Sequence, residues 1–167
     1  MITIIAALSM DGAIGYENRL LYHLNADMKR FKALTVGHTV LMGRNTFESL
    51  PNGALPGRRN LVLTHDTSRT FPGAETCASL EEALSLCPDD EEVFVIGGAR
   101  VYCQALPIAQ RIELTVIHDI PEHADAAFPS FRNSPLWQLT AREDHPADDK
   151  NPYPYTFLTY TKAETVR

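Results

Sequence analysis

The stretch VFVIGGAR, residues 93–100, holds the pattern that decides the fold class. Its first four residues are apolar and predict a buried strand, and the glycine pair Gly97-Gly98 predicts a turn. A helix is predicted directly after this turn, over residues 101–106. A strand that runs through a turn into a helix is the unit from which mostly parallel sheets are built.

The same alternation extends to both ends of the chain. Further strands are predicted over residues 1–9, 38–42, 60–64, 74–77, 111–118, 136–142 and 155–161, and further helices over 25–34, 44–50 and 80–86. The last two strands have no helix between them, which predicts an antiparallel pair. The expected fold is therefore α/β: a single domain over residues 1–167 with a central, mostly parallel eight-stranded sheet, an antiparallel C-terminal edge and about four flanking helices.

Three local signals refine this outline. Asn25 is expected to cap the first helix. Ser79 followed by Glu82 forms a capping-box pattern before the helix at residues 80–86. Residues 12–22 show no clear period and are predicted to form a loop, which at this length is usually functional.

Composition excludes several classes of protein. Lys and Arg number 15 against 21 Asp and Glu, so the formal charge of −6 argues against nucleic-acid binding as the main function. No apolar run approaches the roughly 18 residues of a membrane span, and no secretory signal is evident. The cysteines at 77, 87 and 103 lack metal-site spacing, so we expect no metal, mostly buried reduced thiols and a cytoplasmic location. A monomer is expected because no strong dimer stripe stands out.

In parallel α/β sheets, ligands bind beyond the carboxyl ends of the strands. Asp27 lies in the first turn of a helix whose apolar stripe is formed by Leu24, Met28, Phe31 and Leu34. A carboxylate that faces an apolar crevice can make two charge-assisted hydrogen bonds to an amidine-like edge of a flat heterocycle. The alternative is an acid that only favours the helix dipole.

Two strand ends are suited to phosphate. Gly97-Gly98 precedes a helix, and so does Gly43-Arg44-Asn45-Thr46. Glycines allow backbone N–H groups to approach a phosphate, and an arginine after the second strand suits a 2′-phosphate. Together they predict a phosphorylated dinucleotide, although each alone could be an ordinary turn or a solvated surface arginine. One of the neighbours Arg58 and Arg59 could bind a carboxylate, or both could belong to a basic loop tip.

Other sequence signatures are missing. No G-x-G-x-x-G follows the first strand, and no P-loop, G-x-S-x-G elbow or cluster of metal ligands is present. A standard Rossmann site is therefore unsupported. The six histidines are dispersed and are interpreted as surface or polar-core residues.

Taken in chain order, the pieces resemble dihydrofolate reductase of the bacterial chromosomal type. The matching residues are Ile5-Ala6-Ala7, Ile14-Gly15, Asp27 with Phe31, MGRNTFES at 42–49, LPGR at 55–58, Ile96-Gly97-Gly98 with Tyr102, and Leu114-Thr115. The resemblance extends from Met1 to the final strand. It implies NADPH-dependent reduction of 7,8-dihydrofolate to 5,6,7,8-tetrahydrofolate, by hydride transfer to pterin C6 and protonation of N5, in support of one-carbon metabolism and thymidylate synthesis.

The resemblance also implies a substrate site that antifolates would share. Asp27 would bind the pterin 2-amino group and N3, oriented by the Thr115 hydroxyl, and Arg58 would bind the glutamate α-carboxylate. The implied catalytic residues are Tyr22, Asp27 and Thr115. The other implied substrate-binding residues are Ile5, Ala7, Met28, Phe31, Leu50, Leu55 and Ile96.

An NADPH site is implied beside it, with residues 38–105 as an adenosine-binding lobe and the loop at 12–24 as a lid. In this family the peptide between Gly97 and Gly98 is cis. Arg44, Thr64 and His65 would bind the 2′-phosphate. The full implied set is Ala7, Ile14, Gly15, Gly43, Arg44, Asn45, Thr46, Leu63, Thr64, His65, Ile96, Gly97, Gly98, Ala99, Arg100, Val101 and Tyr102.

This chain departs from the family pattern at three positions. Tyr22 replaces a tryptophan that packs near the substrate, Asn25 replaces a common proline, and Ala99 replaces a third glycine, which requires a negative φ there. Two alternatives stay open: a related reductase of another pterin or a pyrimidine, as in riboflavin synthesis, and a non-catalytic folate- or nucleotide-binding module. Asp27 together with Arg58 argues against the first, because Arg58 has a use only if the substrate carries a distal carboxylate.

Overall fold

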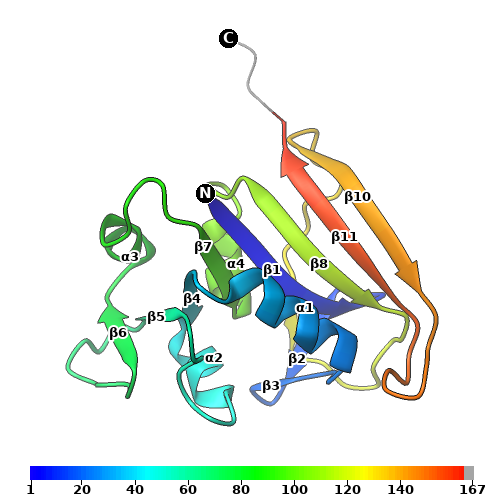
Figure 1. Ribbon diagram of the computed structural model, residues 1–167, viewed down its shortest axis with the longest axis horizontal. Coiled ribbons are helices and arrows are strands. Elements are labelled where there is room, and N and C mark those ends of the chain that lie inside the picture. Colours follow the sequence, from blue (N-terminus) through cyan, green and yellow to red (C-terminus); the bar gives the residue numbers. More distant parts are fainter. Residues whose placement is uncertain (164–167) are drawn as a thin grey trace.

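The computed structural model describes residues 1–163, which form a twisted eight-stranded sheet flanked by helices (Figure 1). The strand order is β10-β11-β8-β1-β7-β4-β5-β6. The strands are β1 (Ile2–Ser9), β4 (Thr39–Gly43), β5 (Arg59–Leu63), β6 (Ala74–Cys77), β7 (Val93–Gly97), β8 (Arg111–Ile117), β10 (Trp137–His145) and β11 (Tyr155–Lys162). All neighbours from β8 to β6 pair in parallel, whereas β10 and β11 pair antiparallel at one edge. The predicted fold class is confirmed.

Four helices cover the two faces of this sheet. They are α1 (Asn25–Thr35), α2 (Arg44–Ser49), α3 (Leu80–Ser85) and α4 (Ala99–Ala105). Helix α1 crosses the front of β1 and β8, and α4 lies behind the sheet (Figure 1). Alternating residues of β1 separate into two apolar clusters, with Ile4, Ala6 and Leu8 in one and Ile5 in the other. This separation follows from the two-residue side-chain period of a strand.

The prediction of a loop over residues 12–22 is wrong in part. This segment contains β2 (Ala13–Tyr16) and β3 (Arg19–Leu20), which form a second, three-stranded sheet with β9 (Ala126–Ala127). Glu17 and Asn18 make the tight turn between β2 and β3 with φ values of 49° and 61°. These strands are too short to show a hydrophobic period, and β2 is paired by a segment more than a hundred residues away.

The two predicted helix caps have different outcomes. The Ser79 hydroxyl accepts a hydrogen bond from the Glu82 N–H at 3.0 Å, so this cap is confirmed. The cap at Asn25 is wrong, because Asn25 is already the first helical residue and the capping position is Leu24. Instead, the Asn151 Oδ1 accepts a hydrogen bond from the Ala26 N–H at 2.9 Å. A distant loop therefore satisfies the helix start, which local sequence rules cannot reveal.

The cysteines are all free, but only Cys77 is buried. Cys87 is half-buried and Cys103 is exposed, so the prediction of mostly buried thiols is wrong for Cys103. It lies on α4, on the side turned away from the sheet, where a short helix presents one face to solvent. Within residues 1–163, no helix is both long enough and apolar enough to cross a membrane.

Candidate active site

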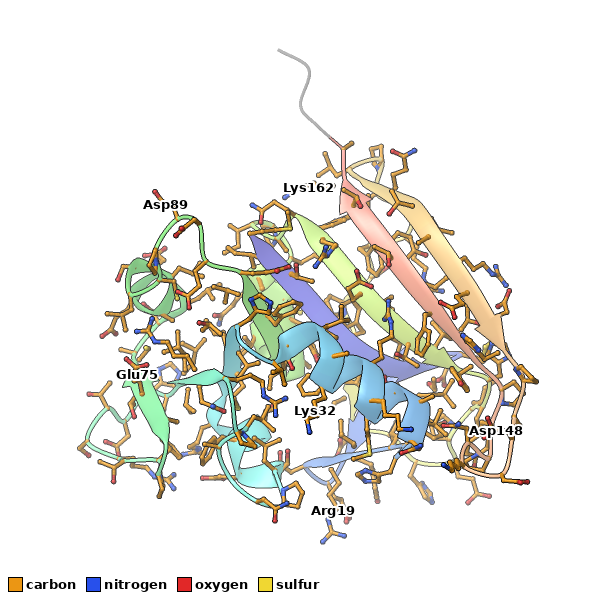
Figure 2. All side chains as sticks on the ribbon, viewed as in Figure 1. Arg19, Lys32, Glu75, Asp89, Asp148 and Lys162 are labelled. Carbon is orange, nitrogen blue, oxygen red and sulfur yellow. The ribbon has the colours of Figure 1, made fainter. Side chains whose placement is uncertain are left out.

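A cleft of about 710 Å³ lies at the carboxyl ends of β1, β4, β5 and β7. Every residue that the sequence predicted for cofactor binding lines this cleft. Its lining also includes residues that were not predicted to bind the cofactor: Tyr16, Asn18, Arg19, Leu20, Ser49, Asp66, Ala78, Ser79, Gln104, Asp125 and Ala126. Several of these come from β2, β3 and β9, the strands that were not predicted. Arg19, on β3, projects from the lower edge of the molecule in Figure 2.

Glycines bring backbone close to the cleft at two strand ends. The peptide between Gly97 and Gly98 is cis, as the resemblance implied, and Gly97 has a φ of 134°. A Cβ atom on Gly97 would lie 3.2 Å from the Thr46 Oγ1, and a Cβ on Gly43 would lie 3.2 Å from a methyl group of Val101. Ala99 is not in the left-handed region, so its side chain is compatible with the start of α4.

Tyr102 connects two central strands beneath the cleft. Its buried hydroxyl oxygen lies 2.9 Å from the carbonyl oxygen of Ile5 and 2.8 Å from that of Ile96. Burial raises the pKa of Tyr102 above its ordinary range, and the negative charge of Asp27 adds to this. The phenol is therefore a neutral hydrogen-bond donor that fixes β1 and β7 where they border the cleft.

Basic and polar side chains gather at the far end of the cleft. Arg44 is exposed and lies 3.9 Å from the Glu48 carboxylate, which is closer to Arg69, at 3.1 Å. Thr64 is buried at the end of β5, and His65 beside it is exposed. Asp66 adds a negative charge to this end, but it accepts hydrogen bonds from the backbone and hydroxyl of Ser68, which lower its pKa.

Asp27 lies half-buried in the first turn of α1. Burial raises the pKa of its carboxyl, while a hydrogen bond from Thr115 and the positive charge of Arg30 act in the opposite direction. Thr115 is buried on β8, so α1 and the sheet together hold this carboxylate. Thr115 was predicted from the resemblance, and Arg30 was not.

The apolar residues predicted for the substrate gather mainly around one cluster, and of these Phe31, Leu50 and Leu55 do not line the cleft described above. Phe31, Leu50, Leu55 and Ile96 are half-buried and pack against the cluster that contains Ile5. Met28 differs from this group, because its side chain is 57% exposed. The predicted apolar stripe of α1 is therefore not buried at Met28, since the helix covers the sheet with only part of its circumference.

The two neighbouring arginines at 58 and 59 have different partners. Arg59 forms an ion pair with Glu75 at 2.6 Å. Arg58 donates to the carbonyl of Pro56 at 3.0 Å and to the hydroxyl of Thr35 at 3.1 Å. No carboxylate of residues 1–163 lies within ion-pair distance of Arg58. Its guanidinium is thus oriented by neutral groups and keeps its charge available.

Asn60 holds the loop that carries Arg58, a role that the sequence analysis missed. Its buried side chain accepts from the Leu55 N–H at 2.9 Å and donates to the carbonyls of Leu55 and Arg58 at 3.0 and 2.9 Å. A polar residue at the start of the apolar strand at residues 60–64 was the available signal.

Tyr22 lies just before α1, in a small cluster with Leu24 and Ala7. Its hydroxyl donates to the Asp119 carboxylate at 2.8 Å, and its ring packs edge-on against Tyr153 with 5.5 Å between centroids. Burial and the Asp119 carboxylate raise the pKa of this phenol. The hydroxyl that distinguishes Tyr22 from tryptophan is therefore bound to a distant loop.

A family model described as dihydrofolate reductase matches residues 1–162. The chain belongs to the dihydrofolate reductase family. It is 44% identical to a dihydrofolate reductase type 3 from Salmonella typhimurium, over 97% of this chain and 98% of that one. It is 43% identical to a dihydrofolate reductase of Bacillus subtilis, over 100% of this chain and 98% of the relative.

A solved structure agrees with these sequence relatives. It is a dihydrofolate reductase from Enterococcus faecalis complexed with NADP(H) and RAB-propyl. Its TM-score to this chain is 0.90 at 33% identity, and the match covers 98% of this chain and 97% of that one. Like these relatives, the present chain is an NADPH-dependent oxidoreductase that reduces dihydrofolate to tetrahydrofolate. The expected family, activity and cofactor are confirmed.

Proposed function

We propose that Asp27 is the residue that binds the pterin of dihydrofolate, and that it does so through the 2-amino group and N3. A half-buried carboxylate between α1 and β8, held by Thr115, is the observation that supports this assignment most directly. Two parallel hydrogen bonds to a carboxylate match the edge of a flat heterocycle and exclude many other orientations. Antifolates that carry a diamino edge are expected to bind the same carboxylate.

The rest of the substrate has a matching set of groups. Phe31, Leu50 and Leu55 offer apolar contacts to the pterin and the aminobenzoyl group, and Met28 lies exposed beside Asp27. Arg58 binds the α-carboxylate of the glutamate, because its guanidinium is pre-oriented by Thr35 and Pro56 and has no protein carboxylate within residues 1–163. A charge-assisted pair of this kind adds both affinity and orientation.

The cleft suits NADPH in size and chemistry. A Cβ atom at Gly97 would intrude on Thr46 and Tyr102, so glycine keeps the backbone accessible there. Arg44, Thr64 and His65 would bind the 2′-phosphate, while Thr46, Gly98, Ala99 and Arg100 would lie along the pyrophosphate. Ala7 and Ile14 would contact the nicotinamide carboxamide. NADPH, when bound, supplies the hydride.

Protonation of pterin N5 needs a donor other than the nearby phenols. The Tyr22 hydroxyl donates to Asp119, and the single Tyr102 O–H is within hydrogen-bond distance of two backbone carbonyl oxygens, either of which can accept it. Both phenols have a raised pKa because they are buried, so neither releases a proton readily. We assign the proton to a water molecule, while Asp27 holds the opposite edge of the pterin and sets its electrostatic environment. Tyr22 then acts by positioning the start of α1.

Residues 12–24 act as a lid over this site. The segment is anchored by Asp125, whose N–H donates to the Gly15 carbonyl and whose carboxylate accepts from the Glu17 N–H, both at 3.0 Å. This hairpin lies outside the central sheet, so it can move without unfolding that sheet, and its closure would exclude water during hydride transfer. A lid of this kind also keeps the two ligands in contact.

The enzyme is assigned to the cytoplasm as a monomer. The three cysteines form no disulfide in the described residues, which fits a reducing compartment.

The direct test is an NADPH oxidation assay with and without dihydrofolate. Oxidation that depends on dihydrofolate is the expected result. A dihydropterin without the glutamate is the matched control, because it retains the edge that Asp27 binds and lacks the group that Arg58 binds. Equal kcat/KM values for the two substrates would contradict the assignment of Arg58.

A further inference from the structure

A partly buried ion pair lies next to the proposed pterin site, and the only role described for it so far is the effect of Arg30 on the pKa of Asp27. Glu113 is on β8, two residues before Thr115, and its side chain is 6% exposed. The Arg30 Nη2 lies 2.7 Å from the Glu113 Oε2. The Thr159 hydroxyl donates to the same oxygen at 2.8 Å.

The geometry places this pair beside Asp27. Arg30 lies three residues after Asp27 on α1, so the two side chains leave neighbouring positions of one helix face. Glu113 and Thr115 share a face of β8, and they pair in register with Thr159 and Phe157 of β11. The Arg30 guanidinium lies 4.4 Å from the centroid of the Phe157 ring. Helix α1 is therefore joined to β8 by the ion pair of Arg30 and Glu113, next to the place where Thr115 acts on Asp27.

Stability alone does not account for such a pair. Removing two charges from water costs about as much free energy as their attraction returns, and well-packed apolar residues often serve as well. Glu113 stands in a strand whose neighbours Ile112 and Leu114 are fully buried, and Arg30 is 24% exposed. The charge of Arg30 reaches Asp27, whereas Glu113 partly neutralises that charge from the other side.

We propose that Arg30 and Glu113 are positioning residues for Asp27: their ion pair fixes α1 on β8 and sets how much positive charge the Asp27 carboxylate experiences. The proposal rests on the assigned role of Asp27 in pterin binding. Arg30 acts as a neighbouring cation, and Glu113 limits its effect. The pair thereby sets the pH at which the carboxylate that holds the substrate becomes neutral.

The groups that face this carboxylate define what a test must keep constant. Arg30 comes from the helix of Asp27, Tyr102 comes from α4, and β8 contributes the uncharged Thr115. Beyond Glu113 lies Arg111, whose Nε is 3.4 Å from the Glu113 carboxylate and whose Nη2 is 2.8 Å from Glu92. Arg111 thus has a second acidic partner, which Arg30 does not have among residues 1–163.

Two substitutions separate positioning from a purely structural role. Arg30→Met removes the cation, so the pKa of Asp27 should rise by roughly half a unit to one unit. Glu113→Gln removes the neutralising carboxylate and leaves Arg30 charged, so the same pKa should fall. The measurement is a ¹³C NMR titration of the Asp27 carboxyl in the ligand-free enzyme, with the pH dependence of hydride transfer as the second readout. Shifts in opposite directions would support the proposal.

Control variants keep the test independent of folding. Arg30→Lys retains the charge and should keep the pKa near that of the unchanged enzyme. Thr159→Val removes a hydrogen bond to Glu113 without a change in charge, so it should lower the melting temperature and leave the pKa of Asp27 in place. Shifts in the same direction for Arg30→Met and Glu113→Gln, or no shift in either, would overturn the proposal. Asp27→Asn tests the role of Asp27 itself, so a failure there is distinguishable from a failure here.

Discussion

Arg58 and Arg59 are adjacent in the chain but have different environments. Arg58 has no protein carboxylate within residues 1–163, and Arg59 pairs with Glu75 at 2.6 Å. We expect Arg58→Leu to raise the KM for dihydrofolate by about 10- to 100-fold with a smaller effect on kcat, because hydrogen bonds to charged groups contribute about 1.5–3 kcal/mol. Steady-state kinetics provide the measurement.

Arg59→Leu is the matched control for that variant. Its ion pair with Glu75 is partly exposed and contributes about 1 kcal/mol or less to stability. The KM for dihydrofolate should therefore not change. An equal rise in KM for both variants would show that the loop as a whole, and not the Arg58 guanidinium, is responsible.

Arg44 is expected to distinguish the two nicotinamide cofactors. Among residues 1–163, the one carboxylate that pairs with its guanidinium is that of Glu48, at 3.9 Å, and Arg44 lines the cleft. Arg44→Ala should weaken NADPH binding by about 10-fold or more and leave NADH binding nearly unchanged, since only NADPH carries the 2′-phosphate. Dissociation constants from fluorescence titration test this, and an equal loss for both cofactors would remove Arg44 from the phosphate site.

At the residue scale, sequence patterns indicated side chains proposed to contact a ligand directly. They did not indicate side chains proposed to act by positioning another residue. Asp27 and Arg58, which we propose bind the substrate, were singled out because each stands in a motif with a recognisable neighbourhood. Arg30 and Glu113 were missed because their partners come from different elements, and a glutamate within an apolar strand was the only signal. The residue pattern alone left open which of Arg58 and Arg59 binds a carboxylate. The resemblance assigned that role to Arg58, and the ion pair of Arg59 with Glu75 agrees with this assignment.

At the level of elements, the start of α1 depends on a residue more than a hundred positions away. The Asn151 side chain is buried and accepts from the Ala26 N–H. Asn151→Ala should lower the free energy of unfolding by about 1–2 kcal/mol and also lower kcat/KM, because α1 carries Asp27. Chemical denaturation and steady-state assays measure the two effects.

Glu82→Ala offers a comparison on another helix. The Glu82 carboxylate accepts from the Ala78 N–H at 2.7 Å beside the start of α3. Its loss should lower the free energy of unfolding by about 0.5–1 kcal/mol without a change in kcat/KM. If Asn151→Ala affected only stability in the same way, α1 would not depend on this cap for its position in the site.

The strands and helices of the central sheet were predictable because each carries its own apolar pattern. Strands β2, β3 and β9 were not, because they have two to four residues each and form only by pairing with one another. Their absence from the prediction also hid part of the cleft wall, including Arg19 and Asp125. Short elements that depend on distant partners leave little local signal.

The whole molecule explains why the site is assembled from remote segments. Strand β1 lies between β7 and β8, so Ile5, Ile96 and Thr115 lie on three adjacent strands at the centre of the sheet although they are far apart in sequence. The alternation of strands and helices predicts a parallel sheet but does not give the order of its strands. That order required the resemblance or the structure.

Asp27 is expected to lower the stability of the molecule at neutral pH. Burial raises the pKa of its carboxyl above the ordinary value of 3.8, so the folded state binds this proton more tightly than the unfolded state does. Stability from this group is therefore present below about pH 3.8 and is lost as the pH rises through the folded pKa. Asp27→Asn should unfold at higher urea concentration at pH 7, by an amount that disappears in acid.

Carboxyl groups whose pKa is lowered, such as Glu75 beside Arg59, instead stabilise the fold as the pH rises. They do so equally in the unchanged enzyme and in Asp27→Asn, so their contribution cancels when the two urea midpoints are compared. A variant that is less stable than the unchanged enzyme at pH 7 would show that the ionised Asp27 carboxylate is well solvated or well paired without substrate.

The most direct test of the account is the rate of hydride transfer in a single turnover, measured from pH 5 to 8 for the unchanged enzyme and for Asp27→Asn. An amide cannot present two acceptor oxygens to the pterin edge or favour the protonated pterin electrostatically. The variant should be slower by orders of magnitude at pH 7 and recover in part toward pH 5, where solvent protonates the pterin more readily. A variant that transfers hydride at the full rate at pH 7 would contradict the role assigned to Asp27.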